Sequence, residues 1–122
     1  MIDHVTLRTH RFQESRRFYL EALAPLGYRV LQDYPEATGM GLSTKADFWI
    51  VGDDPVTAAV HLAFTSADRA GVDAFYAAAL KAGGRDNGPP GIRALYHPHY
   101  YGAFVHDPDG NNIEAVCHEP KG

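Results

Sequence analysis

Three side chains of metal-ligating type, His4, His61 and Glu114, lie in segments that have the alternation of β-strands. His4 and His61 are 57 residues apart and open two segments of similar pattern. If two imidazoles and one carboxylate converge, they suit Fe(II), Mn(II), Ni(II) or Zn(II) and leave coordination positions for water or substrate. Each residue alone also has a plainer interpretation, as a hydrogen-bonded or surface histidine or a solvated glutamate. Their equivalent placement favours a shared metal site.

Other polar and aromatic side chains could complete such a site. Thr6 follows His4 on the same strand face and could donate a hydroxyl, or it is simply a β-branched strand residue. Trp49 aligns with Glu114 when the two halves are compared, and its indole could form an apolar wall or stack on a flat ligand. Arg93 could neutralise an anionic substrate, while the histidines and tyrosines after it could cover the site or merely pack a loop. The candidates for substrate binding are Trp49, Arg93, His97, His99 and Tyr101, and those for catalysis are Thr6, Tyr101 and His99.

An internal repeat determines where these candidates lie. Residues match at a constant offset of 57, which is the signature of two copies of one supersecondary unit. The join falls in the turn-rich stretch 52–55, so we expect one domain over 1–122, with module 1 at about 1–54 and module 2 at about 57–119. The registered matches are His4 with His61, Phe18-Tyr19 with Phe75-Tyr76, Ala22-Leu23 with Ala79-Leu80, and Gly27 with Gly84.

Each copy predicts a strand, a helix and then shorter strands. Alternating residues predict strands over 2–9 and 60–65, with both histidines on the face opposite the apolar side chains. Apolar residues at helical spacing predict one helix over about 12–24 and another that starts at Ser66 or Asp68 and stops at the glycines 83–84. Further strands are expected at about 28–33, 38–43, 47–51, 101–106 and 112–117, the last after a tight turn at 107–110.

The stretch from Asn87 to Pro98 departs from the repeat. It contains Gly88-Pro89-Pro90-Gly91 and His97-Pro98-His99, and we expect a loop too irregular for a strand. The predicted fold class is therefore α+β: two βαβββ modules in one chain form curved mixed sheets around a cup, with the helices on the outer face.

Composition narrows the classes of function. The chain has 122 residues and a net charge of −4, which argues against a nucleic-acid partner. No apolar run is long enough for a membrane span, the N-terminus has no signal-peptide pattern, and the one cysteine permits no internal disulfide. We therefore expect a cytoplasmic protein that binds a small molecule.

The sequence resembles the vicinal oxygen chelate superfamily, also called the glyoxalase/bleomycin resistance protein/extradiol dioxygenase family, over nearly its whole length. The motifs that carry the resemblance are Asp3-His4-Val5, Phe18-Tyr19, Leu26-Gly27, the stretch from Val60 to Phe64, and Asp107-Pro108-Asp109-Gly110-Asn111-Asn112-Ile113-Glu114. The resemblance implies that His4, His61 and Glu114 ligate a divalent metal. It also implies a homodimer, often with each cup built from both chains.

One position departs from the family pattern. Glyoxalase I enzymes place a glutamate where this chain has Trp49, which weakens a lactoylglutathione lyase interpretation. The leading hypothesis is a metal-dependent enzyme that chelates vicinal oxygens of a small substrate, by lyase or isomerase, thiol transferase or dioxygenase chemistry. The alternative is a metal-free protein of the bleomycin-resistance type that sequesters a drug or aromatic ligand. A third hypothesis is an interaction module that binds neither.

Overall fold

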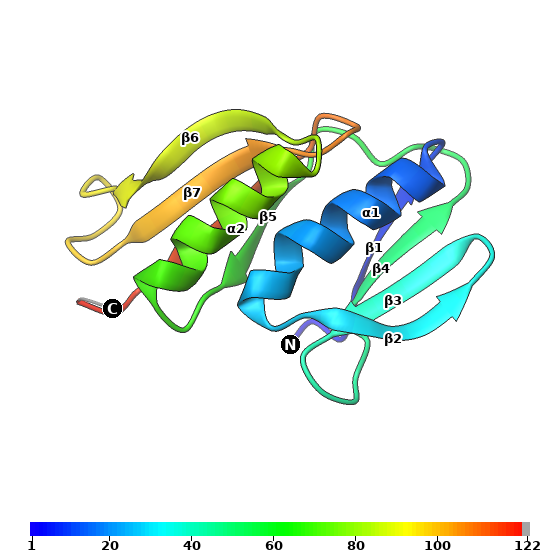
Figure 1. Ribbon diagram of the computed structural model, residues 1–122, viewed down its shortest axis with the longest axis horizontal. Coiled ribbons are helices and arrows are strands. Elements are labelled where there is room, and N and C mark those ends of the chain that lie inside the picture. The colour runs from blue at the N-terminus through cyan, green and yellow to red at the C-terminus, as the bar shows by residue number, and fades with distance from the viewer. Residues whose placement is uncertain (121–122) are drawn as a thin grey trace.

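The computed structural model describes residues 1–120 and contains two separate four-stranded sheets, each covered on one side by a helix (Figure 1). In each module the first strand pairs with the last in parallel, and the remaining pairs are antiparallel. The predicted α+β fold of two βαβββ modules is confirmed. Module 1 contains β1 (Val5–Thr9), α1 (Phe12–Leu23), the 3₁₀ turn η1 (Ala24–Leu26), β2 (Arg29–Tyr34), β3 (Ala37–Gly41) and β4 (Phe48–Gly52), in sheet order β1-β4-β3-β2. Module 2 contains β5 (His61–Thr65), α2 (Arg69–Lys81), β6 (Arg85–Ile92), β7 (Tyr101–His106) and β8 (Asn112–Cys117), in sheet order β5-β8-β7-β6.

Alternation along the strands separates two faces of each sheet. Leu7 of β1 is buried in the core, whereas its neighbours Thr6 and Arg8 are exposed on the other side. In β8, Ile113 and Ala115 likewise belong to the core cluster beneath the helices. We call the side of each sheet that faces away from the helices its open face. Both open faces carry candidate site residues, as the strand pattern predicted.

The helices begin and end where the sequence signals place them. Asp68 caps α2, and its carboxylate accepts a hydrogen bond from the Gly71 amide at 2.8 Å. After α1, Gly27 adopts a left-handed conformation with φ of 94°, which closes the 3₁₀ turn. The two helices contact each other and lie side by side over the two sheets (Figure 1).

The expected loop from Asn87 to Pro98 was wrong in its first half, because β6 runs through Pro89 and Pro90 to Ile92. A proline cannot donate a ladder hydrogen bond, but β6 is the edge strand and pairs only with β7. Its register shifts near Gly88 and again before Gly91, and such irregularity accommodates the prolines.

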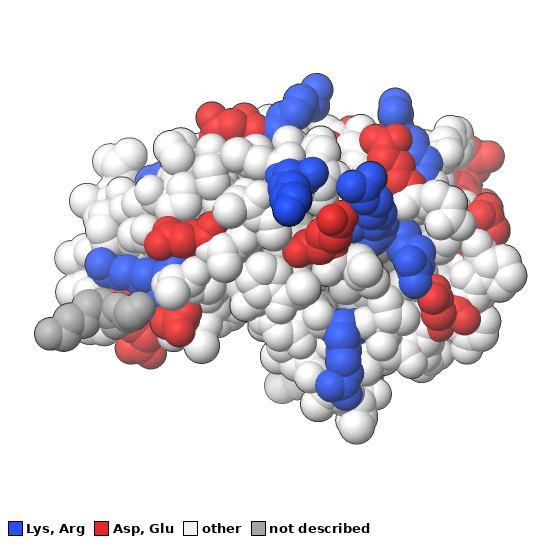
Figure 2. All heavy atoms as spheres, viewed as in Figure 1, with Lys and Arg blue, Asp and Glu red and all other residues white. Residues whose placement is uncertain are grey.

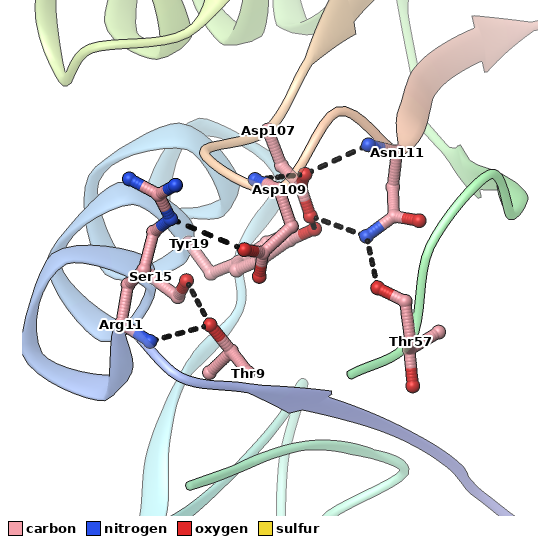
Figure 3. A network of polar contacts seen from close by, with 8 residues as sticks. All are labelled: Thr9, Arg11, Ser15, Tyr19, Thr57, Asp107, Asp109 and Asn111. Atoms are coloured by element: carbon pink, nitrogen blue, oxygen red, sulfur yellow. Dashed lines mark hydrogen bonds and ion pairs between the residues drawn. The ribbon is translucent and has the colours of Figure 1, made fainter. Parts of the chain in front are cut away.

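A buried polar network joins the turn before β8 to α1 (Figure 3). One Asp107 carboxylate oxygen accepts from the amides of Asp109 and Asn111, at 2.9 and 2.8 Å. The other accepts from the Tyr19 hydroxyl at 2.5 Å and from the Asn111 side-chain amide at 2.9 Å. The Asn111 side-chain oxygen accepts from the Val60 amide, at the entrance to β5. The turn that begins at Asp107, part of one motif that carries the family resemblance, therefore connects the two modules.

The face that carries both helices has acidic and basic side chains interspersed, without a field of one sign among the described residues (Figure 2). Neither helix within residues 1–120 has the length and apolar character that crossing a membrane requires.

Candidate functional site

His61 and Glu114 meet on the open face of module 2. The parallel register of β5 and β8 pairs His61 with Asn112 and Ala63 with Glu114, so the two side chains are diagonal neighbours. Nε2 of His61 lies 2.7 Å from Oε1 of Glu114. The glutamate is 1% exposed, whereas the histidine side chain is 54% exposed. A buried carboxylate thus faces a solvent-accessible imidazole on the open face of module 2.

Tyr100 supplies the second partner of the buried carboxylate. Its hydroxyl donates a hydrogen bond to Oε2 of Glu114. Burial, followed by the hydrogen bond to Glu114, raises the pKa of Tyr100, so the hydroxyl keeps its proton and remains a donor. Below the ring the chain has Gly102, where a Cβ atom would lie 3.2 Å from the Tyr100 ring and 3.4 Å from Oε2 of Glu114. The carboxylate is therefore held at both oxygens.

Arg93 contacts the ring of Phe104, which in turn lies near His61. Phe104 is the register partner of Glu114 on β7, and its ring centroid is 6.1 Å from that of His61. The guanidinium carbon of Arg93 lies 5.3 Å from the same ring, and its Nη2 donates to the Pro89 carbonyl at 2.7 Å. A cationic group thus lies against the Phe104 ring, next to the strand position of Glu114.

The remaining candidates His97, His99 and Tyr101 have partners other than Glu114. His97 contacts His118 through ring nitrogens at 2.8 Å, and the His99 amide donates to the other nitrogen of His97 at 3.1 Å. The His99 side chain is exposed. Tyr101 is on the helix side of β7, where its hydroxyl donates to Asp73 of α2 at 2.6 Å.

Sequence reasoning had named Tyr101 for the site and missed the contact between Tyr100 and Glu114. Strand parity could have revealed it. Side chains alternate between the two faces of a strand. Tyr100 is two and four residues before Gly102 and Phe104, which occupy the open face, so it points to that face. Tyr101 is two residues before the core residue Ala103 and points to the helix side.

The corresponding side chains of module 1 lie on the other sheet. His4 precedes β1, is exposed, and its Nδ1 lies 2.8 Å from Oδ1 of Asp3. Asp3 also accepts from Lys45 at 2.5 Å, and Lys45 together with His4 lowers the pKa of the Asp3 carboxyl. Thr6 is exposed next to its register partner Trp49.

Trp49 occupies the place in module 1 that Glu114 has in module 2, as the alignment of the two halves predicted. Its indole lies directly against Gly39 of β3, where a Cβ atom would come within 2.7 Å of the ring. Glycine at this position therefore allows the indole to lie close to the sheet.

A complete three-ligand site does not form within one described chain. Among residues 1–120, no three His, Cys, Asp or Glu side chains are grouped so that they could hold a metal ion. His61 and Glu114 are together, whereas Asp3 is the only side chain that bonds to His4 within residues 1–120. The assignment of all three residues as ligands remains a prediction.

Comparison with known proteins places this architecture in a family. The model of the Glyoxalase/Bleomycin resistance protein/Dioxygenase superfamily matches residues 1–115, and the chain belongs to that superfamily. No curated protein matches the chain.

Solved structures share the fold over nearly the whole chain. A glyoxalase/bleomycin resistance protein from Albidiferax ferrireducens T118 is 29% identical, with a TM-score of 0.81 over 95% of this chain and 97% of that one. A glyoxalase/bleomycin resistance protein/dioxygenase family enzyme from Burkholderia phytofirmans PsJN is 17% identical, with a TM-score of 0.74 over 97% and 98% of the two chains. Glyoxalase I from Zea mays is 21% identical, with a TM-score of 0.69 over 94% of this chain but 43% of that one.

Proposed function

We propose that this protein is a metal-dependent enzyme of the vicinal oxygen chelate type, with His61, Glu114 and His4 as ligands of a divalent metal. The observation that carries the proposal is the buried Glu114 carboxylate with one oxygen turned to the exposed His61 imidazole at 2.7 Å. Imidazole nitrogen and carboxylate oxygen are the donors that Fe, Mn, Ni and Zn accept. The Tyr100 hydroxyl fits the same interpretation, because ligating carboxylates are usually hydrogen-bonded by outer groups.

The third ligand, His4, would come from a second copy of the chain. Within one chain the open faces of the two modules belong to separate sheets that lie beside each other beneath paired helices, so neither faces the other (Figure 1). A two-fold related copy can place module 1 of one chain over module 2 of the other, which forms two equivalent cups. Each cup would then combine His61 and Glu114 with the partner's counterparts of His4, Thr6 and Trp49.

The chain's own residues would bind and orient a small anionic or aromatic substrate. A divalent metal, when bound, supplies Lewis-acid polarisation of substrate oxygens. Arg93 would pair with a negatively charged substrate group beside Phe104. Trp49 would stack on a planar part of the substrate, and Thr6 would donate a hydroxyl from the neighbouring strand. His99 is exposed on the same loop as Arg93 and would approach the substrate only from the rim.

Complementation between chains tests the metal site and the shared cup together. We would purify the variants H4A and E114A alone and as a mixed dimer that carries two different tags, and measure bound metal after incubation with Fe(II), Mn(II), Ni(II) and Zn(II). Each variant alone should lose metal. The mixed dimer should regain one site of two, since one cup then contains all three ligands. A matched control is H10A, because His10 is an exposed histidine with a carboxylate partner outside the site.

Three outcomes would contradict the proposal in different ways. Failure of the wild-type protein to bind any metal would refute the metal site. Metal binding in wild type without recovery in the mixed dimer would refute the shared cup and favour a site within one chain. Unchanged metal content in E114A would refute the role of Glu114. If metal is confirmed, the substrates to test are catechols, thiols and α-ketoaldehydes.

A metal-free ligand-binding protein is the second candidate, favoured by the indole of Trp49 on an open sheet face. This is the only tryptophan of the chain, so its fluorescence reports ligands directly. Quenching by flat aromatic compounds that persists in E114A and in chelator-treated protein would support sequestration. Quenching that requires metal would support the enzyme.

A further inference from the structure

The segment 93–100 connects β6 to β7 and brings Tyr100 to Glu114. Three main-chain hydrogen bonds fold this segment on itself, among them that from the Arg93 amide to the Tyr100 carbonyl at 2.7 Å. We call it the 93–100 loop. It contacts the open face through the hydrogen bond from the Tyr100 hydroxyl to Oε2 of Glu114 and through the Arg93 guanidinium against the Phe104 ring.

A pair of histidines fastens this loop to the segment that follows β8. Nε2 of His97 lies 2.8 Å from Nδ1 of His118, and the ring centroids are 5.0 Å apart. An in-plane hydrogen bond between two imidazoles has about this centroid separation, because each nitrogen lies about 1 Å from its ring centre. The Tyr100 ring packs edge-on against both, with centroids 5.5 and 5.3 Å away. The histidine pair therefore supports the ring that holds Glu114.

The hydrogen bonds determine which nitrogens carry protons. Nδ1 of His97 accepts from the His99 amide, so the proton of neutral His97 is on Nε2. His97 then donates to Nδ1 of His118, which must be unprotonated to accept.

We propose that His97 and His118 are positioning residues, whose hydrogen bond latches the 93–100 loop so that Tyr100 restrains one oxygen of Glu114 and leaves the other to His61 and the metal. The role toward metal rests on the proposed function, whereas the latch is a property of the fold itself. Loss of the latch frees Tyr100, and the carboxylate then loses its fixed orientation. Metal binding should weaken as a consequence.

Two substitutions of His118 distinguish the effect of its hydrogen bond to His97 from the effect of its side-chain volume. H118F keeps a flat ring at the position but removes the acceptor. H118N keeps an acceptor, because the asparagine side-chain oxygen stands nearly where Nδ1 of histidine stands, and this oxygen does not take up a proton near neutral pH. H10F is the matched control at an exposed histidine far from the loop in sequence.

The first readout is hydrogen exchange of residues 93–101 in metal-free protein at neutral pH, corrected for intrinsic exchange. H118F should lose about tenfold of the protection that wild type and H10F show. H118N should retain most of the wild-type protection. Equal protection of wild type and H118F would overturn the latch.

The second readout is metal affinity at neutral pH. H118F should bind metal about tenfold more weakly than wild type, and H118N within about threefold of it. Lost protection in H118F together with unchanged affinity would overturn the positioning role. If wild type binds no metal while the exchange pattern holds, the proposed function fails and the latch stands, so the two failures are distinguishable.

Discussion

Replacement of Asp107 by asparagine should destabilise the fold strongly although the position is outside the candidate site. All four partners of the carboxylate are donors: two main-chain amides on Oδ1, and the Tyr19 hydroxyl and Asn111 side-chain amide on Oδ2 (Figure 3). An asparagine presents one oxygen and one NH₂ group. Whichever way it is turned, two donors face the NH₂ group inside the protein.

The magnitude follows from burial. Asp107 is 3% exposed, Tyr19 and Asn111 are each 1% exposed, and water cannot easily replace the lost acceptor. Each buried donor left without a partner costs about 1–3 kcal/mol, and the Tyr19 hydroxyl can relieve part of the conflict by rotation. We expect D107N to lose about 3 kcal/mol of unfolding free energy, which lowers the melting temperature by roughly 10 °C in a domain of this size.

Urea unfolding followed by circular dichroism measures this loss, with D54N as a control at an exposed aspartate. Tyr19→Phe alone should cost about 1 kcal/mol, and its effect should shrink in the D107N background because the hydroxyl no longer has a carboxylate partner. A loss below about 1 kcal/mol in D107N, or strict additivity with Y19F, would refute the view that Asp107 is the hub that joins the modules.

Three further predictions concern the fold. Burial, and then aspartate partners, raise the pKa values of Tyr19 and Tyr28, so the folded state keeps protons that the unfolded state releases near pH 10. The unfolding free energy should therefore fall as the pH rises above about 10, and it should fall less in Tyr28→Phe. Urea unfolding at increasing pH measures both. Gly39→Ala places a Cβ atom 2.7 Å from the Trp49 ring, so it should lower the unfolding free energy by about 1–3 kcal/mol and shift the tryptophan emission. An unchanged emission spectrum would contradict the placement of the indole. Asp68→Ala removes the cap of α2 and should cost about 1 kcal/mol in thermal unfolding, whereas Asp68→Asn should cost little.

Most of the fold could be predicted from the sequence because local signals and the repeat agree. The period-two alternation gave β7 and β8 with their observed bounds, and the cap at Asp68 and the stop at Gly27 are features of single segments. The prediction failed at β6, where Pro89 and Pro90 look incompatible with a sheet. Only the position of a strand at the edge makes prolines acceptable, and that position is a property of the assembled sheet.

The candidate site, too, could be predicted only where it depends on the alternation of single strands. Strand alternation predicts that His61 and Glu114 point to the same side of the sheet. They come together because β5 and β8 are parallel neighbours in a fixed register, which only the assembled sheet shows. The hydrogen bond from Tyr100 to Glu114 depends on how the 93–100 loop folds back over the sheet. Strand alternation predicts the face to which Tyr100 points but not that Glu114 is its partner.

The location of His4 depends on an arrangement of whole modules that the strand pattern does not encode. Each module buries one face of its sheet beneath its own helix, and the helices then pack together, so the core is complete without any contact between the two open faces. Stability of the single chain therefore places no constraint on where the open face of module 1 docks. If the proposed dimer forms, the energy that brings His4 to His61 and Glu114 comes from an interface between copies. In that case metal occupancy should depend on protein concentration in the range where the dimer dissociates, whereas a site within one chain would show no such dependence.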